Sequence, residues 1–269
     1  MLKLCVIMSV YRKDMIEFVR LSVESILKQS YVDFDLYILY DGYVQKKVDI
    51  YLSNIKDERI KVYRRDDNRG LAYSLNELLN IVMPKGYIYI ARMDADDISM
   101  PDRFEKQLAY MERHPEIDCL GTWAIEIKSD GSEFYRKQMP ETHEGCWSLF
   151  MIRDCMIHPT VMFRRRYIEK AGMYSLNTYF GEDTMMWAQG FANGCKFANL
   201  PEYLFEFRLN DEFFYRRRGW KHAQGILSLR WKVNKMLHYP IKAYFYAIVY
   251  AGAKLMPTPL LRLIYRKAR

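Results

Sequence analysis

Apolar and polar positions along the first 114 residues follow two alternating patterns. Short, nearly continuous apolar runs are typical of buried strands, and the stretches between them carry apolar residues at helical spacing. Strands that alternate with helices in this way predict a parallel α/β sheet. The predicted strands cover residues 2–8, 34–40, 59–63 and 87–93. The predicted helices cover residues 14–29, 44–55, 71–82 and 101–114.

Acidic residues follow two of the predicted strands, at the ends where open α/β sheets bind their ligands. Asp41 ends one strand, and Asp94, Asp96 and Asp97 follow another. Three carboxylates within four residues repel each other, and a divalent cation would offset that repulsion. The alternative is a solvated loop in which Asp97 or Ser99 caps the next helix. Neither GxGxxG nor a P-loop motif occurs in the chain, which argues against a dinucleotide site.

Composition is that of an ordinary globular protein. Of the 269 residues, 50% are hydrophobic and 28% are charged, which excludes wholesale disorder. The five cysteines form no CxxC pair, so we expect reduced thiols in a cytosolic compartment, with Cys5 in the core. The N-terminus lacks the pattern of a signal peptide, and the longest apolar run, residues 243–253, is too short to span a membrane.

Charge is distributed unevenly along the chain. Residues 213–269 contain 13 of the 41 basic residues and none of the 33 acidic ones, which leaves 28 basic against 33 acidic residues in 1–212. Such a segment favours an anionic partner, and its interleaved Trp and Tyr residues fit a helix that lies on an anionic membrane surface. A helical pair packed on the rest of the chain is the alternative. We expect no nucleic-acid partner, because no nucleic-acid-binding motif accompanies the charge.

Two further positions could carry chemistry. The acidic pair Glu182-Asp183 follows Gly181 and opens a predicted helix, where the helix dipole stabilises negative charge without any catalytic role. A carboxylate there could equally act as a general base. His158 precedes Pro159 and is therefore expected in extended backbone, as a structural residue or as a contact with a substrate.

Several stretches of the chain, taken in order, resemble one known family. They read LCVIMSVY, SVESILKQSY, LYILYDG, NRGLAYSLNELL, YIYIARMDADDISMPDRFEKQ, IHPTVMFRR and FGEDTMMW. Together they resemble a family 2 glycosyltransferase of the bacterial surface-polysaccharide type over about residues 1–210, and ARMDADDISMPDRFEKQ is the most specific part. The resemblance implies the GT-A fold, a Rossmann-like mixed sheet. It also implies a nucleotide-sugar donor, a DxD motif that binds Mn²⁺ or Mg²⁺, and inversion at the transferred sugar carbon.

The resemblance also implies roles for the residues on the donor side. The DxD falls on Asp94 and Asp96, with Asp96 as the direct metal ligand and Asp94 as a second ligand or a ribose or sugar contact. Asp41 matches the aspartate that binds the nucleobase, although the usual Asp-Asp-Gly-Ser reads Tyr-Asp-Gly-Tyr here. Asn68 and Arg69 match the loop that faces the nucleotide, with helix capping as the alternative. Arg92 either faces the donor or anchors a carboxylate.

On the acceptor side, the resemblance implies that Asp183 is the general base, with Glu182 as the second candidate. It places His158 near the acceptor. Some members of the family have a third metal ligand, a His, near position 210. This chain has Arg208-Leu209-Asn210 there, so water or Asn210 would substitute.

These observations predict a GT-A catalytic domain over residues 1–212 and a basic, aromatic-rich helical membrane-association segment over 213–269. The predicted reaction moves a hexose from a nucleotide-diphosphate sugar, UDP-linked, to a lipid-diphosphate-linked saccharide at the cytoplasmic face of the cell membrane. A nucleotidyltransferase of similar architecture is one alternative, although residues 9–12, after the first strand, contain no glycine. A non-catalytic membrane-docked binding module is the other.

Overall fold

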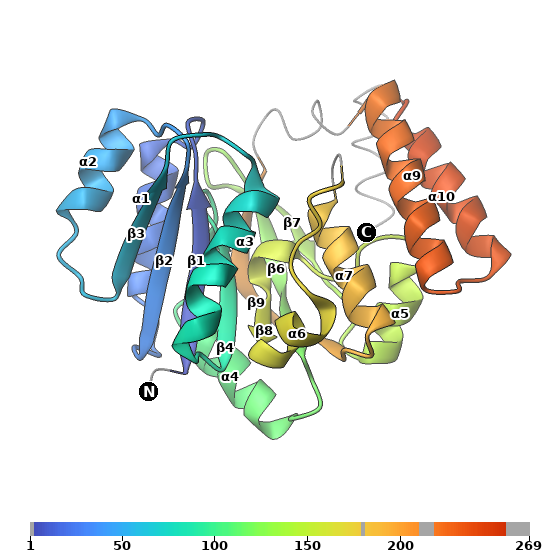
Figure 1. The fold of residues 1–269 in the computed structure, drawn as a ribbon, viewed down its shortest axis with the longest axis horizontal. Coiled ribbons are helices and arrows are strands. Elements are labelled where there is room, and N and C mark those ends of the chain that lie inside the picture. Colours follow the sequence, from blue (N-terminus) through green and yellow to red (C-terminus); the bar gives the residue numbers. More distant parts are fainter. Residues whose placement is uncertain (1–2, 179–180, 210–217, 257–269) are drawn as a thin grey trace.

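The computed structural model describes residues 3–178, 181–209 and 218–256. Its centre is a mixed sheet of nine strands within those ranges, in the order β3-β2-β1-β4-β8-β6-β9-β5, with β7 paired to β6 (Figure 1). Asn210 lies outside the described residues, so its predicted role as a metal ligand stays a prediction.

The first half of the sheet is parallel, as the alternation of strands and helices predicts. Its strands are β1 (Leu4–Val10), β2 (Phe34–Asp41), β3 (Ile60–Arg65) and β4 (Tyr89–Asp94). The crossovers run through α1 (Ile16–Leu27), α2 (Lys46–Asn54), α3 (Leu71–Val82) and the short 3-10 helix η1 (Met83–Lys85). Because these crossovers return the chain so that all four strands run in the same direction, the carboxyl ends of the strands meet at one edge of the sheet.

The second half of the sheet adds antiparallel pairs, which makes the whole sheet mixed, as the family resemblance implied. β8 pairs antiparallel with both β4 and β6, and β5 pairs antiparallel with β9, while β6 and β9 are parallel. These strands are β5 (Ile98–Ser99), β6 (Cys119–Lys128), β7 (Glu133–Lys137), β8 (Met162–Arg164) and β9 (Phe197–Leu209). The helices that accompany them are α4 (Arg103–Arg113), α5 (His143–Phe150), η2 (His158–Thr160), α6 (Arg165–Ala171) and α7 (Glu182–Ala192).

Apolar side chains fill both faces of the sheet. Along β1, Cys5 and Ile7 belong to the cluster that contains α3 and α7, whereas Leu4, Val6 and Met8 belong to the cluster that contains α1 and α4. This alternation follows from the two-residue period of a strand. Cys5 is fully buried, as predicted for a core thiol.

Two C-terminal helices, α9 (Trp220–Met236) and α10 (Ile241–Ala253), stand side by side at the end of the molecule remote from α2 (Figure 1). Leu229 and Val233 of α9 are buried in the same cluster as Trp187 of α7. Trp220 and Trp231 instead remain 67% and 50% exposed. None of the described helices combines the length and apolar composition that a membrane crossing requires.

The alternative reading of Asp97 and Ser99 as helix caps is wrong. The N-cap residue of α4 is Asp102, and the side chain that accepts from the start of this helix is that of Gln29, whose Oε1 bonds to the Phe104 N–H at 3.0 Å. Ser99 accepts a hydrogen bond from the Gln29 amide, and Asp97 accepts one from the backbone N–H of Arg208. Both side chains are turned into the protein by the pairing of β5 with β9, which the local sequence does not reveal.

Candidate active site

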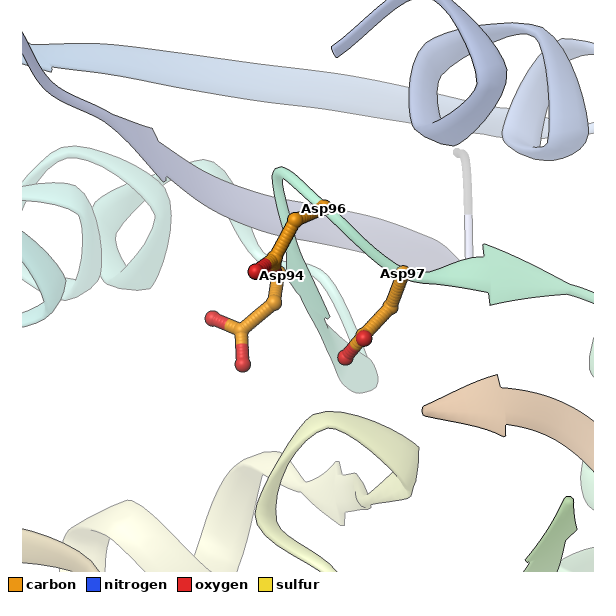
Figure 2. A group of neighbouring side chains, drawn as sticks. All are labelled: Asp94, Asp96 and Asp97. Atoms are coloured by element: carbon orange, nitrogen blue, oxygen red, sulfur yellow. The ribbon is translucent and has the colours of Figure 1, made fainter. Parts of the chain in front are cut away.

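Three carboxylates gather directly after β4, at the carboxyl edge of the parallel strands. One carboxylate oxygen from each of Asp94, Asp96 and Asp97 lies within 4.8 Å of the corresponding oxygens of the other two (Figure 2). An all-oxygen, carboxylate-rich donor set is the kind that Mg²⁺ and Mn²⁺ prefer. The residues present therefore fit the predicted divalent cation. The sequence analysis grouped all three carboxylates as a possible cation site and assigned the ligands themselves to Asp94 and Asp96, and the structure brings Asp97 into the same group.

Burial and mutual repulsion make this cluster unfavourable when it is fully charged. Burial, reinforced by the nearby Asp94 carboxylate, raises the pKa of Asp96 to about 6. Burial also raises the pKa of Asp97 well above its ordinary value, with Asp96 and Asp94 adding to the effect. Asp14, on the loop before α1, faces the same group, and burial raises its pKa to about 8, with smaller contributions from Asp96 and Asp94. A cation would relieve this repulsion.

Two arginines, one on β4 itself and one on β9, hold the cluster in place. Arg92 contacts Asp94 through Nη2, 2.5 Å from Oδ1. The Arg208 backbone N–H donates to Asp97 Oδ1 at 2.7 Å, and its Nε donates to the Asp96 carbonyl oxygen at 2.8 Å. Arg208 lies on β9, so the residue that braces the cluster comes from more than 100 positions away in the chain.

Arg92 is buried on β4 and is only partly satisfied. Its side chain is 1% exposed, and besides the contact with Asp94 its Nε and Nη1 have no hydrogen-bond partner among the described residues. Buried guanidinium N–H groups without acceptors are costly. The structure therefore contains the carboxylate anchor that was one of the two predicted roles, together with two free donors beside the acidic cluster.

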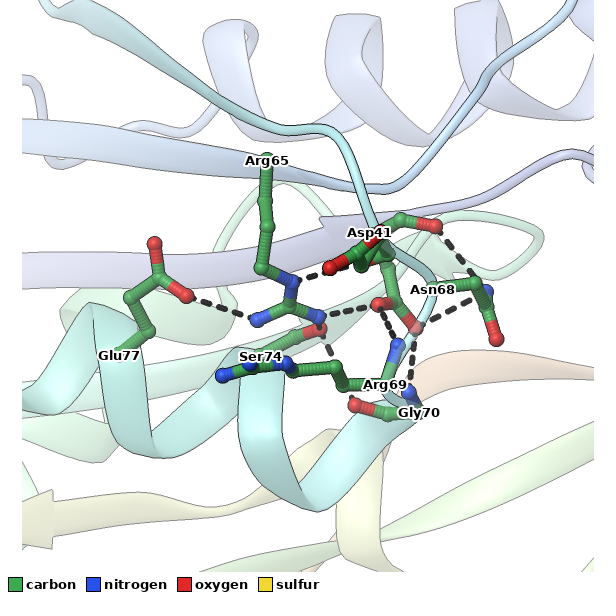
Figure 3. A network of polar contacts seen from close by, with 8 residues as sticks. Asp41, Arg65, Asn68, Arg69, Gly70, Ser74 and Glu77 are labelled. Carbon is green, nitrogen blue, oxygen red and sulfur yellow. Dashed lines mark hydrogen bonds and ion pairs between the residues drawn. The ribbon is translucent and has the colours of Figure 1, made fainter.

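Asp41 organises a second acidic position, at the end of β2 (Figure 3). Its Oδ1 accepts from Arg65 Nη2 and, at 2.8 Å, from the Arg69 N–H, and its Oδ2 accepts from Asn68 Nδ2 at 3.2 Å and the Gly70 N–H at 2.8 Å. These four donors fill the usual capacity of a carboxylate. Arg65 was missed by the sequence analysis, and the Asn68 amide binds Asp41 rather than capping α3, whose N-cap is Gly70.

Gly42 lets this loop close onto the strand end. Its φ is +76°, and a Cβ atom there would lie 2.7 Å from the backbone nitrogen of Asn68. Any other residue would therefore be both strained and in collision with the loop. The turn after Asp41 consequently brings residues 67–68 directly against the end of β2.

Glu182 and Asp183 occupy the first turn of α7 behind the N-cap residue Gly181, which has no side chain to cap the helix. Asp183 Oδ1 accepts from the N–H of Thr184 at 2.7 Å. This position is electrostatically favourable for carboxylates, so the dipole interpretation and the general-base interpretation both fit it.

His158 begins η2 and is 8% exposed. Its Nε2 and the Tyr174 hydroxyl share a hydrogen bond of 2.8 Å, and its ring packs edge-on against Trp187. Burial, followed by the proximity of Arg92, lowers the pKa of His158 well below its ordinary value, so it is neutral. Arg92 thus links the acidic cluster to the predicted acceptor-side histidine.

Solved structures share this architecture. A mannosyltransferase from Pyrobaculum calidifontis, in complex with GDP-Man and Mn²⁺, superimposes with a TM-score of 0.64 at 13% identity, over 99% of this chain and 80% of that one. S. aureus TarS 1–349 in complex with UDP-GlcNAc gives 0.62 at 14% identity, over 99% and 92%. The fold, with its carboxylate cluster at the strand ends, is that of a GT-A glycosyltransferase, as predicted.

The amino-acid sequence assigns the chain to a particular family within this fold. The model of "Glycosyl transferase family 2" matches residues 5–172, and the chain belongs to this family. It is therefore a glycosyltransferase, and both alternatives, nucleotidyltransferase and non-catalytic binding module, are set aside.

Curated relatives fit the predicted surface-polysaccharide type. The chain is 30% identical to the amylovoran biosynthesis glycosyltransferase AmsE of Erwinia amylovora, over 98% of both chains. It is 32% identical to the O-antigen biosynthesis glycosyltransferase WbnJ of Escherichia coli, over 77% of this chain and 80% of that one. Identity is 27% to an E. coli UDP-Gal:alpha-D-GlcNAc-diphosphoundecaprenol beta-1,3-galactosyltransferase, over 98% and 96%.

Proposed function

We propose that this glycosyltransferase moves a hexose from a nucleotide-diphosphate sugar, UDP-linked, to a saccharide carried on a lipid diphosphate in surface-polysaccharide synthesis. The observation that carries the proposal is the cluster of Asp94, Asp96 and Asp97 beside the partly satisfied Arg92. Relatives named for amylovoran, O-antigen and diphosphoundecaprenol-linked products support the acceptor class.

On the donor side, we propose that Asp96 and Asp94 hold Mn²⁺ or Mg²⁺, with Asp97 as the third carboxylate of the group. Such an ion would neutralise charge on the departing diphosphate. Arg92 Nε and Nη1 have no acceptor but are buried, so we propose that Arg92 acts on the donor through its positive charge beside the cluster. Because the oxygens of Asp41 are already engaged, Asp41 acts on the nucleobase chiefly by holding Asn68 and Arg69 in the nucleotide-facing loop.

On the acceptor side, we propose that Asp183, or else Glu182, takes the proton from the acceptor hydroxyl. The hydroxyl oxygen then attacks the anomeric carbon as the bond to the nucleoside diphosphate breaks, so that the configuration at this carbon inverts. His158 is neutral and bonds to the buried Tyr174 hydroxyl, so we propose that it supports the acceptor side through this hydrogen bond.

A stability screen tests the donor assignment. UDP-, GDP- and TDP-sugars are each added with Mn²⁺, because the structural neighbours contain both UDP- and GDP-linked sugars. Ligands that bind the native state raise the melting temperature by mass action. We expect a UDP-hexose to give the largest rise and EDTA to abolish it. A larger rise in melting temperature with GDP- or TDP-sugars would reject UDP as the donor nucleotide. An equal rise in the presence of EDTA would reject the need for a metal ion.

For the membrane, we propose that α9 and α10 attach the enzyme peripherally to the anionic inner face of the cell membrane. On α10, Ile241, Phe245, Ile248 and Val249 are exposed by 89%, 64%, 54% and 55%. Their spacing of four, three and one places them on one face of the helix. Exposed lysines accompany them at positions 221, 232, 235 and 242, and residues 213–269 contain no acidic residue. Apolar and basic groups together fit a lipid surface better than a protein partner.

Vesicle co-sedimentation of the full-length chain tests this attachment. We expect binding to anionic vesicles at low salt, absent from neutral vesicles and weakened by high salt, because each surface Lys or Arg contributes about 1 kcal/mol. The double substitution I241S/F245S should abolish binding without unfolding the protein, since both side chains are exposed.

Val32→Ser is the matched control, because Val32 is 60% exposed and precedes β2. Truncation near residue 212 is a poorer test, because it also removes Leu229 and Val233 from the core. Full binding of the double variant, or none by the unaltered protein at low salt, would reject the membrane role.

A further inference from the structure

The acidic pair at the start of α7 lies between two anchors that both come from α9. Gly181, immediately before the pair, has a φ of +88°, and a Cβ atom on it would lie 2.3 Å from Leu229 Cδ2. Leu229 therefore packs directly on the residue that precedes Glu182. The next residue of α9, Arg230, reaches the residue that follows Asp183 through one intermediary.

That intermediary is Asp154, in the loop after α5. Its Oδ1 accepts from Arg230 Nη2 at 2.9 Å and from the Thr184 hydroxyl at 2.8 Å. Arg230 also donates from Nη1 to the carbonyl oxygen of Phe150 at 2.9 Å, so its guanidinium is held at two points. The Arg230 side chain is 3% exposed, and Thr184 is likewise buried.

The buried Arg230 guanidinium holds a carboxylate that also meets water, since the Asp154 side chain is 32% exposed. Without Arg230, Asp154 would lose its cationic partner, and we expect it to turn further toward solvent and release the Thr184 hydroxyl. The first turn of α7 would then keep the packing of Leu229 on Gly181 and hydrogen bonds within the turn, such as the one from the Met185 N–H to the Gly181 carbonyl oxygen, but it would lose its polar connection to Arg230.

We propose that Arg230 is a positioning residue for the transfer reaction: through Asp154 and Thr184 it fixes the turn of α7 that carries Glu182 and Asp183. The inference rests on the proposed function, in which this pair supplies the general base. It makes α9 part of the catalytic apparatus as well as part of the segment proposed to meet the membrane.

The test compares kinetics and donor binding in Arg230→Met, Arg230→Lys and Asp154→Ala. Arg230→Met should lower kcat about 10- to 100-fold, since small misplacements of a catalytic group have effects of this size. Its affinity for the donor should stay unchanged, because the Asp94–Asp97 cluster is untouched. Arg230→Lys keeps the charge and should retain most of the turnover. The double variant of Arg230→Met with Asp154→Ala should lose no more than either single variant, because both break the same connection.

Val233→Ala is the control for structural damage. Val233 is fully buried on α9, one turn beyond Arg230. Its truncation should lower the melting temperature while leaving kcat unchanged, with the folded fraction counted by donor titration. Equal losses of kcat in Arg230→Met and Val233→Ala, or additive losses in the double variant, would overturn the positioning role.

Hydrogen exchange separates this inference from the proposed function. Arg230→Met should accelerate exchange of the amides of residues 184–187, and Val233→Ala should not do so selectively. Unchanged exchange there overturns the positioning role by itself. Full turnover in both Asp183→Asn and Glu182→Gln instead overturns the assignment of the base, whatever the exchange shows.

Discussion

Asp96→Ala is expected to abolish the metal-dependent binding of the donor while the protein stays folded. Asp96 and Asp94 would hold a divalent cation that neutralises the donor diphosphate, so the loss of Asp96 should remove the binding of the metal and of the donor together. The fold should not suffer, because burial and Asp94 already disfavour the charged form of Asp96, as its pKa of about 6 indicates. Without metal, the melting temperature of the variant should equal or exceed that of the unaltered protein.

Isothermal calorimetry with UDP and Mn²⁺ measures the effect. Asp102→Ala is the matched control: this carboxylate lies in the same segment, is 43% exposed and pairs with Lys106 on the surface. It should bind donor normally. Metal-dependent affinity that persists in Asp96→Ala would rule out Asp96 as a ligand, and a lower melting temperature would show that Asp96 supports the fold instead.

Asp183→Asn is expected to bind donor almost normally and to lose turnover by about 10²- to 10⁴-fold, the usual contribution of a positioned general base. Asparagine keeps the shape of the side chain and can still accept the Thr184 N–H, but it cannot take a proton at neutral pH. The loss should therefore appear in kcat and leave the donor affinity in place.

Glu182→Gln is the paired variant, because the two carboxylates are adjacent in the first turn of the same helix. Steady-state transfer to a lipid-linked acceptor, with donor affinity measured separately, compares the two. An active Asp183→Asn beside an inactive Glu182→Gln would move the base to Glu182. Activity in both would leave the acidic pair with the role that the helix dipole alone explains.

The two C-terminal helices fit both interpretations of the basic segment, as a helical pair packed on the rest of the chain and as a surface for lipid. Leu229 and Arg230 of α9 face the catalytic part, whereas Trp220 and Trp231 remain exposed. α10 presents its apolar face to the surroundings. A helical pair that is packed on the catalytic part can therefore still offer a surface to lipid, and the two predictions from the sequence are compatible.

The local pattern of apolar residues in the sequence by itself determined the helices and strands of the first half of the sheet. Apolar runs and helical spacing place β1 to β4 and α1 to α4 within a few residues of their observed ends, because burial on a sheet or along one helix face imposes a short period. The same pattern marks the strand ends where Asp41 and Asp94 stand. The family resemblance then implied a glycosyltransferase, and the family model confirmed that membership.

Contacts between distant segments were decided only by the tertiary structure. The antiparallel pairing of β8 with β4, the bracing of Asp97 by Arg208 and the pairing of Asp41 with Arg65 join residues between 24 and 111 positions apart. The connection from Arg230 through Asp154 to Thr184 is of the same kind. No periodic signal precedes such contacts, because a side chain far along the chain becomes a neighbour only after the core has packed. The sequence thus determined which acidic groups stand at the strand ends, and the tertiary structure decided which basic groups hold them there.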